Sequence, residues 1–156
     1  MTISLSSTGF GNLATIPTEY TCDGADVSPP LTWSGIPQGA KSVVLFCDDP
    51  DAPVSNWVHW VCYDIPVTSG GLPRSVPKTD MIPSGGKQGL NDFRKIGYGG
   101  PCPPSGTHRY FFKVYALDCM LECGAGESKQ EIEQAMKGHI LAEGQLIGTY
   151  SRKPKK

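Results

Sequence analysis

The segment Ser-Val-Val-Leu-Phe-Cys, residues 42–47, is a near-continuous apolar run that ends at two adjacent carboxylates, Asp48 and Asp49. A short apolar run of this kind is typical of a strand that is buried on both faces. We therefore expect residues 42–47 to form a core strand that delivers Asp49 at its end.

Two longer segments have the alternating pattern of strands, Trp57–Ile65 and His108–Leu117. Because side chains of a strand point alternately to its two faces, each segment divides into two sets. In the first segment, one face is predicted to carry Trp57, His59, Val61 and Tyr63. In the second, one face is predicted to carry His108, Tyr110, Phe112 and Val114, with Arg109 on the opposite face.

Shorter strands are predicted at residues 2–5, 16–21, 31–33 and 146–150. One helix has a clear start, because Ser128 followed by Glu131 three residues later is a capping box. Gly138 is the best candidate for the residue that ends it. The helix spacing places four apolar residues on one face, namely Ile132, Ala135, Met136 and Ile140.

This order of elements indicates a mainly β fold, an antiparallel β-sandwich with one or two short helices, rather than alternating strands and helices. The 156 residues suffice for a single domain, which we place at residues 1–152. Residues 153–156 form a basic tail with the character of a solvated terminus.

Composition excludes several classes of function. The chain has 14 Lys and Arg against 15 Asp and Glu, so no basic excess favours nucleic acid. No stretch approaches the ~20 consecutive apolar residues of a membrane span. Residues Met1–Ser6 have neither a positive region nor a long apolar core, so we expect no signal peptide and a cytoplasmic location.

The six cysteines are expected to be free thiols in that compartment. Cys47 and Cys62 lie in apolar runs and are predicted to be small core residues. Cys119 and Cys123 have no second cysteine pair to complete a zinc site, so we expect no metal there and interpret them as loop thiols.

Two proline-stiffened polar loops carry the candidate chemistry, residues 49–53 and 100–110. If the sheet brings them together, a carboxylate and the imidazoles of His59 and His108 would surround a small pocket. Its walls would be Pro53, Pro103, Pro104, Trp57 and Tyr110. An acid would orient an imidazole, whose outer N–H would face a small anion such as phosphate or a carboxylate.

A purely structural interpretation competes with this site. Asp-Pro sequences start turns, so Asp49 and Asp51 could be turn formers only. A single histidine in a strand is more often a satisfied structural group than a ligand-binding one. Arg109, which faces away from His108, is better explained as a structural ion pair with one of the acids.

Four motifs resemble the phosphatidylethanolamine-binding protein family, also called Raf kinase inhibitor-like. They are Tyr20–Gly24, Ser28–Trp33, Asp49–Pro53 and Gly106–Tyr110. The segments Gly138–Glu143 and Gly148–Tyr150 are similar to the bacterial and archaeal branch. The resemblance extends from about Leu5 to Arg152.

The resemblance implies a β-sandwich with a small surface pocket for phosphate-like groups, including phospholipid headgroups. Carried over residue by residue, the ligand-binding positions are Asp49, Asp51, Pro53, Trp57, His59, Pro103, His108 and Tyr110. Cys22 and Cys102 belong to motifs that approach the same end of such a sandwich, and their proximity is a further hypothesis.

This sequence departs from the family in two places. The loop Val54–Asn56 is shorter than in the animal proteins, which puts their partner-binding rim in doubt. Their C-terminal extension is also not matched, so the pocket is more open unless His139 and its neighbours cover it.

Three functions follow as hypotheses. The first is a non-enzymatic protein, without cofactor, that binds phosphate or a phosphoethanolamine-like anion and has a regulatory role. The second is a protein-interaction module, such as a kinase inhibitor, whose pocket acts as a switch. The third, hydrolysis with Ser105, lacks a Gly-x-Ser-x-Gly elbow and an identifiable oxyanion hole. We expect no stable membrane insertion, and a homodimer only by analogy with prokaryotic relatives.

Overall fold

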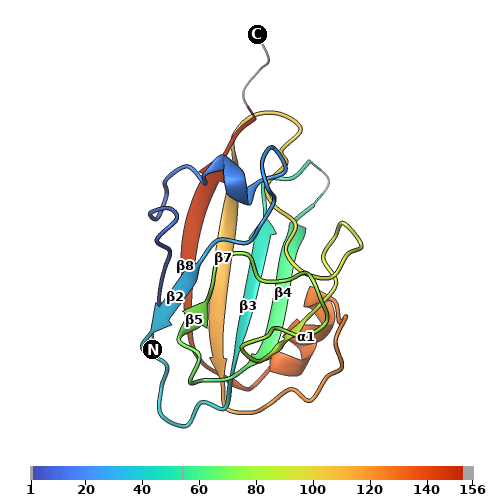
Figure 1. The fold of residues 1–156 in the computed structure, drawn as a ribbon. Coiled ribbons are helices and arrows are strands. Elements are labelled where there is room, and N and C mark those ends of the chain that lie inside the picture. The colour runs from blue at the N-terminus through green and yellow to red at the C-terminus, as the bar shows by residue number, and fades with distance from the viewer. Residues whose placement is uncertain (1, 54, 153–156) are drawn as a thin grey trace.

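A computed structural model describes residues 2–53 and 55–152, so the basic tail at 153–156 lies outside the described residues. Two antiparallel sheets pack face to face (Figure 1). The larger sheet has the order β6 (Lys87–Gln88), β4 (Trp57–Ile65), β3 (Ser42–Asp49), β7 (His108–Leu117) and β8 (Ile140–Tyr150). The smaller sheet has the order β1 (Ser4–Ser6), β2 (Leu31–Ser34) and β5 (Gly71–Leu72). The predicted antiparallel β-sandwich is confirmed.

Strand β3 lies at the centre of the larger sheet, and all eight of its residues are buried. On one face, Leu45 belongs to the core between the sheets, together with Trp33 of β2. On the other face, Phe46 packs in a second cluster with Ile132 of the helix. Burying one such side chain stabilises the fold by roughly 1.5–3 kcal/mol, so the apolar run forms the core strand that its sequence predicts.

The helix α1 (Lys129–Met136) covers the outer face of the larger sheet near β4 (Figure 1). Its predicted capping box is present: the Glu131 amide donates to the Ser128 hydroxyl at 3.1 Å, and the Ser128 amide donates to the Glu131 carboxylate at 3.0 Å. The chain leaves the helix through Gly138, whose φ of 80° is readily adopted by glycine. Both predicted ends of the helix are confirmed.

Three predicted strands differ from the structure, and the first of them covers Ser4–Ser6 rather than residues 2–5. Residues 16–21 form no strand, because Pro17 precedes a short 3₁₀ helix at Thr18–Tyr20. The last strand begins at Ile140 rather than residue 146, since it pairs along the whole length of β7. Ile140 is therefore 44% exposed at the start of β8 and is not part of the apolar helix face.

Within the described residues, no helix is both long enough and apolar enough to span a membrane.

Truncating a buried side chain of the core strand should destabilise the fold. We expect Leu45→Ala to lower the free energy of unfolding by about 2–5 kcal/mol, because Leu45 is fully buried and the deletion leaves a cavity. Leu90→Ala is the matched control, since Leu90 is 39% exposed, and should change it by about 0.5 kcal/mol or less. Urea denaturation measures both values, and equal losses would contradict the assignment of β3 as the core strand.

Candidate functional site

Asp49 and His108 form the centre of the site. Asp49 is the last residue of β3 and His108 the first of β7, the strand beside it in the sheet. The Nδ1–H of His108 donates to Oδ2 of Asp49 at 2.6 Å, and both side chains are more than nine-tenths buried. The amide of Asp51 donates to the other carboxylate oxygen of Asp49 at 2.8 Å. With Nδ1 engaged, Nε2 is the nitrogen of His108 available to a ligand.

His59 reaches the site through a β-bulge. Cys47 pairs with Trp60 and Asp48 with Val58, so His59 is an extra residue of β4 opposite β3. The bulge interrupts the strict alternation on which the predicted face of His59 depended. His59 contacts Tyr110, a member of the core between the sheets, whereas Val58 packs with Val61 in the cluster on the helix side. The predicted grouping of His59 with Val61 is therefore wrong.

The environment of His59 specifies its hydrogen bonding. Its Nδ1 lies 2.6 Å from the carbonyl oxygen of Gly99, which can only accept, so Nδ1 carries a proton. Burial lowers the pKa of His59, which favours the neutral ring. Nε2 of a neutral His59 is then a hydrogen-bond acceptor, the complement of a donor on a bound molecule.

Tyr110 places a hydroxyl without a hydrogen-bond partner next to these groups. The hydroxyl is buried, and it has no partner among the described residues. Burial raises the pKa of Tyr110, and the nearby Asp49 carboxylate raises it further. Leaving a buried hydroxyl without a partner costs about 1–3 kcal/mol, which a hydrogen bond to the adjacent Asp49 carboxylate or to a bound molecule would offset.

A cavity of about 220 Å³ connects these groups. The residues that line it are Asp49, Ala52, Pro53, Trp57, His59, Phe93, Cys102, Pro103, Pro104, His108 and Tyr110. All the predicted ligand-binding residues except Asp51 are therefore brought together. A larger hollow of about 990 Å³ lies along β1 and β8 and is lined by none of these residues, so size alone does not identify the site.

Asp51 supports the site instead of lining it. Its carboxylate accepts two hydrogen bonds from the Arg109 guanidinium, both at 2.9 Å, and one from the Arg109 amide at 2.8 Å. The hydrogen bonds from the Arg109 side chain lower the pKa of Asp51 to about 2. The predicted structural ion pair of Arg109 is confirmed. This pair ties the Asp49–Pro53 loop to the start of β7.

Phe93 is the largest of the cavity-wall residues that the sequence did not predict. Its ring makes edge contacts with Trp57 and His59, with centroids 5.5 and 5.3 Å apart. The Asn91 side chain accepts from the Phe93 amide at 2.9 Å, and Asp92 accepts from the Val58 amide at 2.7 Å. These hydrogen bonds are those of a turn, and Asn-Asp sequences favour turns. Asn91 and Asp92 were therefore the available sequence signal for the position of Phe93. Ala52 and Cys102 were also not predicted as lining residues.

A disulfide joins Cys22 to Cys102, whose Cα atoms are 5.4 Å apart. It confirms the hypothesis of proximity and corrects the expectation that all six thiols are free. The amide of Cys22 also donates to the carbonyl of Pro101 at 3.1 Å. Because the bond spans 80 residues, the loss of chain entropy in the unfolded state corresponds to roughly 4–5 kcal/mol. It anchors the loop that carries Pro103.

The other four cysteines are free thiols, as predicted. Cys47 and Cys62 are free and buried, as predicted for core residues. Cys119 and Cys123 are free and half-buried.

Comparison with known proteins places this arrangement in context. Residues 6–151 match the family model of the phosphatidylethanolamine-binding proteins. The "UPF0098 protein" of Methanothermobacter thermautotrophicus is 51% identical over 150 residues, which cover 96% of this chain and 99% of that protein. The corresponding protein of Aquifex aeolicus is 50% identical over 149 residues, which cover 94% of this chain and 86% of that protein.

Two solved structures have the same fold. A phosphatidylethanolamine-binding protein homologue from Chlamydia trachomatis has a TM-score of 0.90 at 39% identity, covering 97% of this chain and 99% of that one. YbcL of E. coli, described as a member of the mammalian family, has a TM-score of 0.90 at 34% identity. The match covers 98% of this chain and 100% of YbcL.

The ion pair of Asp51 should be visible in acid unfolding. Its folded pKa of about 2 lies below the unfolded value of about 3.9, so its contribution to stability is present above pH ~4 and is lost as the pH falls towards 2. Asp51→Asn should remove this part of the pH dependence in urea titrations at a series of pH values. Asp80→Asn, which changes an exposed carboxylate outside the cavity, should retain it. An unaltered acid profile in Asp51→Asn would contradict the assignment.

The disulfide predicts the number of reactive thiols. Protein unfolded without reductant should react with a thiol reagent at four cysteines, and protein unfolded with reductant at six. Six reactive thiols before reduction would show that Cys22 and Cys102 are not bonded.

Proposed function

This chain belongs to the phosphatidylethanolamine-binding protein family, and we propose that it is a non-enzymatic protein that binds small phosphate-like anions and has a regulatory role. One observation carries the proposal. The buried Asp49–His108 pair lies in the same small cavity as a Tyr110 hydroxyl that has no partner among the described residues.

The groups that face the cavity suit a phosphate or carboxylate. The Tyr110 hydroxyl is a donor for anionic oxygens, and Nε2 of His108 is a second donor whenever the ring is protonated. Neutral His59 accepts from a protonated oxygen or an amine. The negative charge of Asp49 is already engaged by His108 and by the Asp51 amide. A volume of about 220 Å³ is below the usual 300–1,000 Å³ of sites for drug-sized ligands, so the cavity fits a headgroup-sized anion.

The same geometry supports binding without hydrolysis. Ser105, the candidate nucleophile, is exposed and does not line the cavity. Cys102, the cysteine among the lining residues, is held in the disulfide. Among the described residues, the wall therefore holds no serine, no threonine and no free cysteine beside the histidines.

A second candidate function is a protein-interaction module whose pocket acts as a switch. A neighbouring cavity of about 550 Å³ shares Phe93 and Cys102 with the anion cavity and includes Lys78 and Lys95. Phe93, which lines both cavities, is 37% exposed. A partner seated on this surface would contact the wall of the anion cavity directly.

We place this function in the cytoplasm. The Cys22–Cys102 bond is compatible with that location in hyperthermophilic organisms, whose intracellular proteins are rich in disulfides. A homodimer remains a prediction.

Calorimetry with inorganic phosphate and phosphoethanolamine tests the proposal. Wild type should bind, and Tyr110→Phe should bind roughly 10- to 100-fold more weakly, because it loses one hydrogen bond to a charged group. His108→Ala should abolish binding. Tyr115→Phe is the matched control, since Tyr115 lies on the opposite face of β7, and should bind as wild type does. No heat with wild type at millimolar ligand would refute the proposal.

The affinity should depend on pH. We expect phosphate to bind more weakly as pH rises through roughly 6 to 8, because protonated histidine provides the favourable charge. Titrations of wild type across this range measure the dependence, and an affinity that does not change with pH would contradict a charged histidine in the site.

A further inference from the structure

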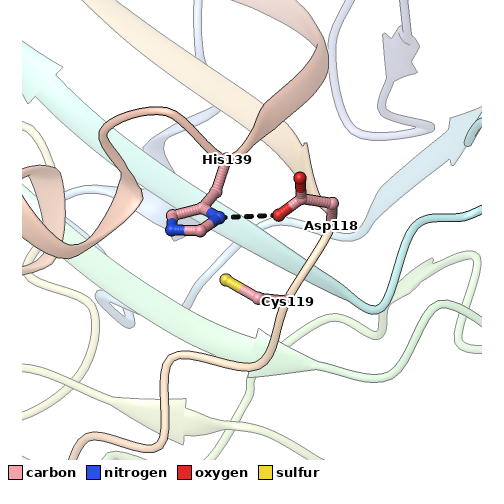
Figure 2. A group of neighbouring side chains, drawn as sticks. All are labelled: Asp118, Cys119 and His139. Carbon is pink, nitrogen blue, oxygen red and sulfur yellow. Dashed lines mark hydrogen bonds and ion pairs between the residues drawn. The ribbon is translucent and has the colours of Figure 1, made fainter.

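Three side chains with the chemistry of transition-metal ligands converge at the far end of β7. Asp118 and Cys119 directly follow β7, and His139 directly precedes β8 (Figure 2). One ligand atom from each lies within 4.8 Å of the other two. We propose that Asp118, Cys119 and His139 bind a divalent transition-metal ion of the zinc class, with a fourth position open to solvent.

The backbone holds these residues in place without any metal. The Asp118 amide donates to the His139 carbonyl at 3.0 Å, which extends the pairing of β7 and β8. The His139 amide donates to the Met136 carbonyl at 2.9 Å, at the end of α1. The Ser42 hydroxyl donates to the Cys119 carbonyl at 2.6 Å. Ligands carried on such fixed backbone need little reorganisation to bind an ion.

The side chains require only a small adjustment. Zinc bonds to nitrogen, oxygen and sulfur are about 2.0–2.3 Å long, which places tetrahedral ligand atoms roughly 3.3–3.8 Å apart. Nδ1 of His139 now lies 2.7 Å from a carboxylate oxygen of Asp118, in a hydrogen bond that the ion would replace. Both side chains are 44% exposed, so they can rotate apart towards the metal.

The donor set selects the kind of ion. A thiolate and an imidazole favour zinc and related transition metals, whereas magnesium and calcium prefer oxygen ligands only. The carboxylate of Asp118 and the thiolate of Cys119 together neutralise the two charges of the ion. Three protein ligands leave one tetrahedral position for water or another molecule, the arrangement of open zinc sites.

The sequence spacing groups Cys119 with Cys123, but the structure separates the two cysteines. The Cys123 thiol lies 3.6 Å from the Leu121 carbonyl and is outside the three-residue group. The absence of a second cysteine pair was the reason to expect no metal. That reason does not apply to a site completed by a histidine and a carboxylate from another strand.

The metal site is independent of the anion cavity. His108 and Asp118 lie at opposite ends of the ten-residue strand β7, roughly 30 Å apart at the rise of an antiparallel strand. The inference therefore does not rest on the proposed function, and either can fail without the other.

Titration with cobalt(II), a spectroscopic probe for zinc sites, tests the inference on the untagged full chain. It is done under nitrogen without added thiol, so that the disulfide stays intact. Wild type should develop a near-ultraviolet charge-transfer band from thiolate to cobalt, which added zinc removes. Cys119→Ser should lose the band, and Cys123→Ser, the matched control, should keep it. His139→Ala should weaken cobalt binding by more than the roughly 10- to 100-fold that loss of an outer-shell partner causes.

The controls decide between this site and a bare surface ion pair of Asp118 with His139. Metal-free Cys119→Ser and His139→Ala should melt at nearly the wild-type temperature, because neither side chain belongs to a core cluster. Cys123 packs against the second cluster, so Cys123→Ser is compared with its own metal-free form. Added zinc should raise the melting temperature of wild type and of Cys123→Ser, but not of Cys119→Ser. Absence of the band in wild type, its loss in Cys123→Ser, or unchanged affinity in His139→Ala would each overturn the inference.

Discussion

Strand β3 has to be covered on both of its faces, and the rest of the structure follows from that constraint. The small sheet covers one face and α1 the other, while β4 and β7 pair with its two edges. Its apolar residues give way to Asp48 and Asp49 where the strand ends. The core strand therefore fixes the position of a buried carboxylate, and its neighbours supply the histidines that meet it.

The cavity depends on groups that are stabilised from outside it. The Asp51–Arg109 pair holds the loop after β3, and the Cys22–Cys102 bond holds the loop before β7. Neither the ion pair nor the disulfide needs to contact a ligand to shape the cavity, because each positions one of its walls. At the other end of β7, pairing with β8 brings His139 to Asp118 and Cys119 in the same way. Both candidate sites thus use the ends of one rigid strand.

The sequence by itself determined the elements whose signals are local. The apolar run at residues 42–47 predicted the core strand, and Ser128 with Glu131 predicted the start of the helix. The proline-rich loops predicted most of the cavity wall, together with His59 and His108. These predictions succeed because burial pattern, capping and proline stiffness depend on neighbouring residues in the chain.

Only the tertiary structure decided what depends on pairing between distant segments. A bulge opposite β3 turned His59 towards Tyr110, and strict alternation within β4 cannot reveal an extra residue relative to its partner strand. The position of Phe93 in the wall, the Cys22–Cys102 bond and the approach of His139 to Cys119 likewise require strand register and loop closure. The register of two strands is fixed by contacts across the sheet, which the alternation within one strand does not specify.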